Sequence, residues 1–137
     1  MIRHTLTLVV IILLAACSTE KTPLVATDVV ISRPIPGMQT TAAYFVLSNN
    51  TTQAITITDV TSPHFESVEM HESTLEDGMT RMYALGELTI LAGATVRFEP
   101  GRKHLMLIRP TGDVDTVTLE FYAGRAIVLT VNVTFKE

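Results

Sequence analysis

Short runs rich in β-branched and aromatic residues, each followed by turn-forming residues, recur along most of this chain. Such a succession is the signature of an all-β fold, either a β-sandwich or a barrel. Within residues 116–122, apolar side chains occupy every second position (Val117, Leu119 and Phe121), as expected for a strand with one buried and one solvated face. The expected strands are 28–33, 41–48, 54–60, 66–72, 80–85, 87–91, 94–98, 103–108, 116–122 and 126–135. No long helical period is present, and a helical turn is expected only in the acidic segment 75–78.

The N-terminal residues have the pattern of a secretory leader. Arg3 is followed by an apolar run over residues 6–14, which is too short to span a bilayer comfortably. Residues 14–17 (Leu-Ala-Ala-Cys) look like a bacterial lipobox, in which Cys17 becomes the lipidated first residue of the mature protein. An ordinary secretory signal is the alternative. The lipobox is favoured because the only cysteine stands where cleavage is expected.

This leader defines the expected organisation of the chain. We predict a lipoprotein signal peptide at 1–17, a polar tether at 18–27 and a single β-domain at 28–137. A lipid on Cys17 would anchor the mature protein to a membrane in the periplasm. Ser18, rather than Asp, follows the cysteine, which resembles the pattern that directs lipoproteins to the inner face of the outer membrane.

Charge and cysteine content exclude several functions. The chain has ten basic and fourteen acidic residues, a net charge of −4, and no basic stripe, which argues against a nucleic-acid partner. If lipid consumes Cys17, the β-domain has no disulfide and no thiolate for a blue-copper electron-transfer site. No local motif pairs a nucleophile with a base, so a hydrolase finds little support. We therefore expect a protein without enzymatic activity.

Four side chains between residues 69 and 108 form a candidate metal site: His71, Met82, His104 and Met106. All four are neutral donors, two imidazoles and two thioethers. Thioether sulfur is polarizable and weakly basic, so it disfavours hard cations and suits copper(I), and imidazole binds copper as well. A set of two His and two Met without a carboxylate or thiolate therefore predicts a Cu(I) site.

The spacing of these donors allows them to meet. Side chains at positions i and i+2 of a strand point to the same face, so His104 and Met106 can converge while Leu105 faces the core. Between His71 and Met82, residues 73–78 end in Asp-Gly, a hairpin turn signal. A hairpin there would bring His71 and Met82 close together.

The arrangement His-x10-Met-x21-His-x-Met resembles the PCu(A)C family of periplasmic copper chaperones. The matching residues lie in 68–72, 76–82 and 103–107, and the resemblance extends from about residue 29 to the end of the chain. It implies a cupredoxin-like β-barrel that holds Cu(I) through His71, Met82, His104 and Met106. It also implies delivery of Cu(I) to the CuA site of cytochrome c oxidase, so the expected partner is oxidase subunit II or another copper chaperone.

Other residues near the motif are weaker candidates. Met70 should point away from His71 into the core or rim, whereas Met79 could be a spare thioether but is expected at the surface. Met38 lies in a loop that could approach the site, with an exposed position favoured. His64 is expected at the surface, with a Cu(II) contact as the lesser alternative. The acidic cluster around His71 is either a solvated rim or a docking surface, and consists of Glu69, Glu72, Glu76 and Asp77.

Two further functions remain compatible with these residues. One is a copper buffering or resistance lipoprotein without a dedicated acceptor. The other is a structural β-sandwich lipoprotein in which the histidines and methionines are incidental, and this alternative predicts that the protein retains no copper.

Overall fold

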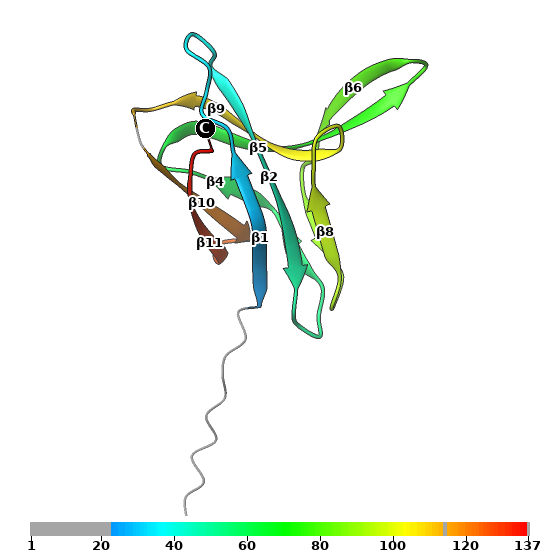
Figure 1. Cartoon of the computed structure of the whole chain (residues 1–137). Coiled ribbons are helices and arrows are strands. Elements are labelled where there is room, and N and C mark those ends of the chain that lie inside the picture. Colours follow the sequence, from blue (N-terminus) through cyan, green and yellow to red (C-terminus); the bar gives the residue numbers. More distant parts are fainter. Residues whose placement is uncertain (1–22, 114, 137) are drawn as a thin grey trace, which may run out of the picture.

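A computed structural model describes residues 23–113 and 115–136, and every regular element in these ranges is a β-strand (Figure 1). This confirms the all-β, single-domain prediction. None of the described residues forms a helix with the length and hydropathy needed to cross a membrane. The strands are β1 (Leu24–Ile31), β2 (Thr40–Asn49), β3 (Ile55–Ile57), β4 (Asp59–Thr61), β5 (Phe65–Glu76), β6 (Met79–Ala84), β7 (Leu88–Ile90), β8 (Thr95–Phe98), β9 (Lys103–Pro110), β10 (Thr116–Ala123) and β11 (Ala126–Thr134).

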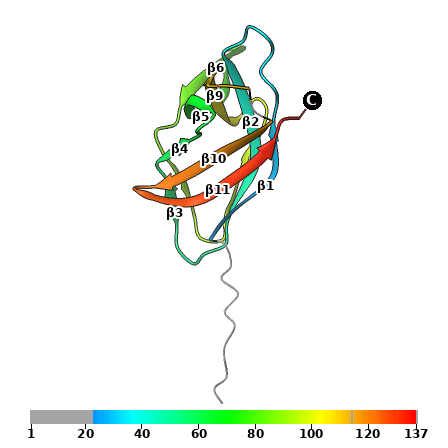
Figure 2. The ribbon, with the colours of Figure 1, turned by 90° about the vertical axis from the view of Figure 1, so that its left-hand side faces the viewer.

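The main sheet has the strand order β1-β2-β9-β5-β6, and β8 also pairs with β2. A second sheet, β11-β10-β4, packs against it, and β3 pairs with β7 in a small third sheet (Figure 2). All of these strand pairs are antiparallel. The β5–β6 hairpin projects from the body of the sandwich (Figure 1).

The hydrophobic core lies between the two larger sheets. Val117, Leu119 and Phe121 of β10 are buried, which confirms the alternation predicted for that strand. From the main sheet, Phe45 of β2 meets Phe121 edge to face, with ring centroids 5.6 Å apart. Such aromatic pairs stabilise a fold by about 0.5–1.5 kcal/mol beyond the area that they bury. The main sheet is therefore held with one face on the core, and its other face is free to display functional side chains.

The first strand begins earlier than predicted. β1 starts at Leu24, so residues 24–27, which were expected in the tether, are strand. Leu24 is fully buried and pairs with Asn49 of β2. Asp28 has a positive φ of 53°, and the register shifts between Thr27 and Val30. This irregularity interrupts the alternation that would have marked the strand in the sequence. The predicted leader 1–17 and the tether residues 18–22 lie outside the described residues.

The predicted strand 54–60 is two strands that belong to different sheets. β3 pairs with β7, and β4 pairs with β10. Thr58, between them, donates its backbone N–H to the carbonyl oxygen of Tyr122 at 2.8 Å. The chain therefore leaves one sheet and joins the other at Thr58, a change that depends on distant strands and has no local signal.

The helical turn expected at 75–78 is wrong. β5 continues through Glu76, which pairs directly with Met79 of β6. Asp77 and Gly78 form the two-residue turn, with φ angles of 50° and 77°. Two consecutive positive φ angles are typical of a type I′ hairpin, for which Asp-Gly is a preferred sequence. The Asp-Gly hairpin prediction is thus confirmed.

Candidate metal centre

Strand β9 presents His104 and Met106 on the face of the main sheet that is turned away from the core. Leu105, between them, is completely buried, as expected from the two-residue period of a strand. His104 is also buried, with 6% of its surface exposed, and Met106 is half-buried. Ala42 of β2 is the Cα partner of Met106.

Strand β5 places His71 directly opposite His104. The two residues are Cα partners in the antiparallel β5–β9 pair. Their imidazole rings have centroids 5.8 Å apart and planes at 74° to one another. Since Glu69 pairs with Met106 in the same register, Glu69 and His71 lie on the face that holds His104 and Met106.

The β5–β6 hairpin adds Met82 to this group. Met82 pairs with Ser73, so it lies on the same face as His71 and diagonal to it. The Nδ1 atom of His71 and the Sδ atom of Met82 are 3.1 Å apart. This confirms that the hairpin brings the two residues together. Sequence reasoning from the Asp-Gly turn therefore identified a real contact.

Hydrogen bonds orient both imidazoles. The Nε2 atom of His71 lies 2.8 Å from Oε2 of Glu69. The Nδ1 atom of His104 lies 3.0 Å from the backbone carbonyl oxygen of Arg102. Glu69 was expected only as a member of an acidic cluster. The rule that groups residues i and i+2 on one face, applied to β5, would have placed its carboxylate beside His71.

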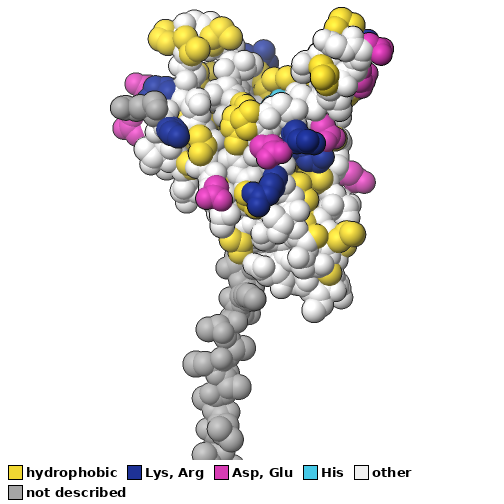
Figure 3. Space-filling model, turned by 45° about the vertical axis from the view of Figure 1, so that its right-hand side comes forward, with side chains coloured by type: hydrophobic (Ala, Val, Ile, Leu, Met, Phe, Trp, Pro, Cys, Tyr) yellow, Lys and Arg dark blue, Asp and Glu magenta, His cyan; other side chains and the backbone are white. Residues whose placement is uncertain are grey.

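The four candidate donors differ in their accessibility. His104 is buried, the side chain of His71 is 13% exposed, and Met82 is 49% exposed on the projecting hairpin. Figure 3 shows a small area of histidine surface in a hollow bordered by hydrophobic side chains. A ligand held here would therefore be anchored by buried groups on the sheet and covered by an accessible group on the hairpin.

Among the described residues, the donors other than methionine do not form a metal site by themselves. Within residues 23–113 and 115–136, no three His, Cys, Asp or Glu side chains are grouped so that they could hold a metal ion. The further candidate donors on the face of His71 and His104 are the thioether sulfurs of Met82 and Met106. Such a set matches the donor chemistry of copper(I).

The acidic cluster is divided between the two faces of the hairpin. Glu72 accepts a 2.6 Å bond from Nζ of Lys103 on the face opposite His71. On that same face, Glu76 accepts bonds from Arg81 and from the hydroxyl of Tyr83. This bond raises the pKa of Tyr83, because the carboxylate stabilises the protonated phenol. Of these carboxylates, only that of Glu69 lies beside a candidate metal ligand.

Met70 and Met79 lie on strand faces opposite to the one that holds the four donors. Met70 is buried in the core, as predicted. Met79 is 58% exposed, and its pairing with Glu76 places it on the hairpin face opposite Met82. Met38 is exposed in the loop before β2, where its N–H donates to the carbonyl of Ile35.

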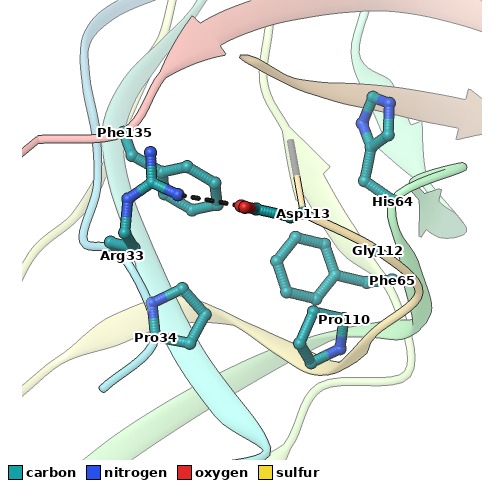
Figure 4. Close-up of a pocket in the computed structure, with 8 residues that line it drawn as sticks. All are labelled: Arg33, Pro34, His64, Phe65, Pro110, Gly112, Asp113 and Phe135. Atoms are coloured by element: carbon teal, nitrogen blue, oxygen red, sulfur yellow. Dashed lines mark hydrogen bonds and ion pairs between the residues drawn. The ribbon is translucent and has the colours of Figure 1, made fainter. Parts of the chain in front are cut away.

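His64 lies at the other end of the sheet. It is half-buried rather than on the surface, and its Nδ1 accepts a 3.1 Å bond from the backbone N–H of Thr118. It lines a separate pocket of about 340 Å³ with Arg33, Pro34, Phe65, Pro110, Gly112, Asp113 and Phe135 (Figure 4). Along β9, Pro110 is roughly 20 Å from His104 at the rise of a strand. His64 therefore does not belong to the group formed by His71 and His104.

Comparison with known proteins identifies a family and a shared fold. Residues 24–134 match the model of the family described as "Putative lipoprotein LpqE-like". A 75-residue segment is 27% identical to the uncharacterized protein RP573 of Rickettsia prowazekii (strain Madrid E). That match includes 54% of this chain and 41% of the relative, so the chain spans less than half of the length of this curated relative.

Solved structures share the fold at low sequence identity. The copper-bound PCuAC domain from PmoF2 superposes with a TM-score of 0.67 and 14% identity, over 83% of this chain and 92% of that domain. The apo form of the same domain gives the same TM-score and identity, over 83% and 90%. Apo-DR1885 from Deinococcus radiodurans superposes with a TM-score of 0.62 and 24% identity, over 100% and 94%. The expected cupredoxin-like fold of PCuAC domains is thus confirmed.

Proposed function

This chain belongs to the LpqE-like family of lipoproteins, and from that premise we propose that it is a copper(I) carrier at the periplasmic surface of a membrane. One Cu(I) ion binds through His71, Met82, His104 and Met106. The protein performs no chemistry on the ion. It keeps copper reduced, shields it from other ligands and releases it to an acceptor.

A single contact supports this function most directly. Nδ1 of His71 and Sδ of Met82 are 3.1 Å apart, and both atoms offer an electron pair when the neutral imidazole has its proton on Nε2. Nitrogen and sulfur ligands on one tetrahedral ion, at bond lengths of ~2.0 and ~2.3 Å, lie roughly 3.5 Å apart. The two donors therefore already stand close to the separation that a shared metal ion requires.

The chemistry of the set favours Cu(I) over Cu(II). Two thioethers match the softer, less highly charged ion, and no thiolate is present among the described residues. Bound copper should resist oxidation in air and lack an intense thiolate-to-copper absorption band. The similarly folded PCuAC domain from PmoF2 is described as copper-bound, which supports copper as the metal.

The graded exposure of the donors supports release by ligand exchange. Met82 is 49% exposed on a hairpin, whereas His104 is 6% exposed within the sheet. An incoming ligand of the acceptor can replace Met82 first, because thioethers bind and leave without gaining or losing a proton. The less exposed imidazoles then hold the ion until the acceptor has bound it.

The leader and the family resemblance support a location and an acceptor for this carrier. A lipid on Cys17 would hold the β-domain at the membrane surface, on the inner face of the outer membrane in our proposal. The acceptor would be the CuA site of cytochrome c oxidase subunit II or a second copper chaperone. Soft, exchangeable ligands on both this protein and the acceptor would allow Cu(I) to be transferred without a change in oxidation state.

Two measurements test this proposal. The full-length protein in mild detergent should bind one Cu(I) under reducing conditions, with nitrogen and sulfur neighbours in X-ray absorption. Spectra with only nitrogen and oxygen neighbours would remove the thioethers from the site. In copper-limited cells, a variant with Met82→Leu and Met106→Leu should lose cytochrome oxidase activity. Normal oxidase activity with copper binding lost would refute delivery and favour a buffering role.

A further inference from the structure

We infer that Glu69 is a positioning residue that selects Nδ1 of His71 as its copper-binding atom, so that His71 and His104 bind copper through different ring nitrogens. His71 binds through Nδ1 and His104 binds through Nε2. This inference rests on the proposed function and extends it, because it assigns the ligating atoms and the residue that determines one of them.

The position of Glu69 follows from strand geometry. It precedes His71 by two residues on β5, so both side chains lie on the face of the candidate site. Oε2 of Glu69 is 2.8 Å from Nε2 of His71. An ionised carboxylate can only accept a hydrogen bond, so Nε2 must donate. In the neutral imidazole the electron pair then resides on Nδ1, the atom that lies 3.1 Å from Sδ of Met82.

His104 has the opposite arrangement. Its Nδ1 is 3.0 Å from the carbonyl oxygen of Arg102, which also can only accept. Nδ1 of His104 therefore has the proton, and Nε2 is free to bind a metal. The two histidines lie directly opposite each other on antiparallel strands, yet different hydrogen-bond acceptors assign them different ligating atoms.

The same geometry argues that Glu69 is not itself a copper ligand. Its carboxylate oxygen binds one nitrogen of the His71 ring, and the other nitrogen of that ring faces Met82. The electron pairs of the two ring nitrogens diverge, so one ion cannot contact both Nδ1 and this oxygen while the bond persists. Glu69 instead fixes the ring orientation and raises the basicity of the ligating nitrogen, a common role for a carboxylate behind a metal-bound histidine.

Nitrogen NMR of ¹⁵N-histidine-labelled protein tests the assignment before any metal is added. In the full-length apoprotein in mild detergent at about pH 8, where an unperturbed imidazole is neutral, His71 should be protonated at Nε2 and His104 at Nδ1. Glu69→Leu should remove the preference of His71 and leave that of His104 unchanged. A wild-type His71 protonated at Nδ1 would overturn the inference, whether or not the protein binds copper.

Copper binding provides the second measurement. Addition of Cu(I) should shift Nδ1 more than Nε2 in His71 and Nε2 more than Nδ1 in His104, and a larger shift at Nε2 than at Nδ1 of His71 would refute the inference. Glu69→Leu should lower Cu(I) affinity about 10- to 100-fold, as is typical when a partner behind a metal-bound histidine is lost. Glu69→Gln retains an oxygen acceptor and should stay closer to the wild type. Equal losses in Glu69→Gln and Glu69→Leu would show that charge or direct ligation matters instead.

Glu72→Leu is the matched control. Glu72 lies on the same strand but on the opposite face, where it pairs with Lys103. Glu72→Leu changes the local charge by the same amount as Glu69→Leu but leaves the hydrogen bond between Glu69 and His71 in place. Cu(I) affinity should therefore stay within a small factor of the wild type, and a loss equal to that of Glu69→Leu would refute positioning. Unchanged His104 resonances in every variant verify that the sheet is intact.

Discussion

The β5–β6 hairpin offers a comparison between two methionines on one strand. Met82 lies on the face of His71, with its sulfur 3.1 Å from Nδ1. Met79 lies on the other face and is 58% exposed. We predict that Met82→Leu removes a copper ligand with little effect on folding, and that Met79→Leu affects neither property.

In Met82→Leu, the free energy of Cu(I) binding should change much more than the free energy of unfolding. Leucine and methionine have similar volumes, and Met82 is 49% exposed, so the free energy of unfolding should change by less than about 0.5 kcal/mol. Loss of a direct ligand should exceed the ~100-fold upper range for loss of an outer-shell partner. A 100-fold loss of Cu(I) affinity corresponds to about 2.8 kcal/mol.

Competition with a chromophoric Cu(I) chelator measures the Cu(I) affinity, and urea unfolding of the apoprotein measures the free energy of unfolding. X-ray absorption should also lose one sulfur neighbour in Met82→Leu and none in Met79→Leu. Equal Cu(I) affinity in Met82→Leu and the wild type would refute the assignment of Met82. Equal losses in the two variants would show that the hairpin acts through its shape rather than through a specific sulfur.

Three further predictions test other parts of the molecule. Cu(I) affinity should fall between neutral and acidic pH because protons compete for the imidazole nitrogens, and an affinity that stays constant in a chelator-competition series would exclude His71 and His104 as ligands. Cys17→Ala should abolish membrane association in cell fractionation while copper stoichiometry is unchanged, and loss of copper would instead make Cys17 a ligand. Glu76→Gln should lower the raised pKa of Tyr83 toward its ordinary value of about 10 in an ultraviolet titration. Because the folded-state pKa of Tyr83 is raised, its bond to Glu76 stabilises the fold below about pH 10. This stabilisation is lost as the pH rises through the pKa of Tyr83 in the folded state. An unchanged pKa of Tyr83 in Glu76→Gln would show that Glu76 does not cause the raised pKa.

Features with a local cause could be predicted from the sequence. The alternation of Val117, Leu119 and Phe121 predicted a strand with one buried face, and the structure buries all three. The placement of His104 and Met106 on one face required only the two-residue period of a strand. The Asp77-Gly78 hairpin required only the backbone preferences of those two residues.

Other features depend on strands that are distant in the sequence. The break at Thr58 exists because β4 pairs with β10 rather than continuing beside β7. The early start of β1 depends on burial of Leu24 against the rest of the core, and the irregularity at Asp28 hides it from a periodicity count. Neither the break at Thr58 nor the early start of β1 leaves a local pattern in the sequence, because the contacts that stabilise them form only once the sheets assemble.

The candidate site shows the same division. Residue types and spacing determined which four side chains could bind copper(I), since donor softness is a property of each side chain alone. The Asp77-Gly78 turn had already indicated that Met82 approaches His71. Only the tertiary structure decided that His71 lies directly opposite His104. It also decided which ring nitrogen each histidine offers. That choice depends on acceptors at Glu69 and Arg102, each two residues before its histidine, and their distance and direction depend on the folded conformation of the side chains and backbone.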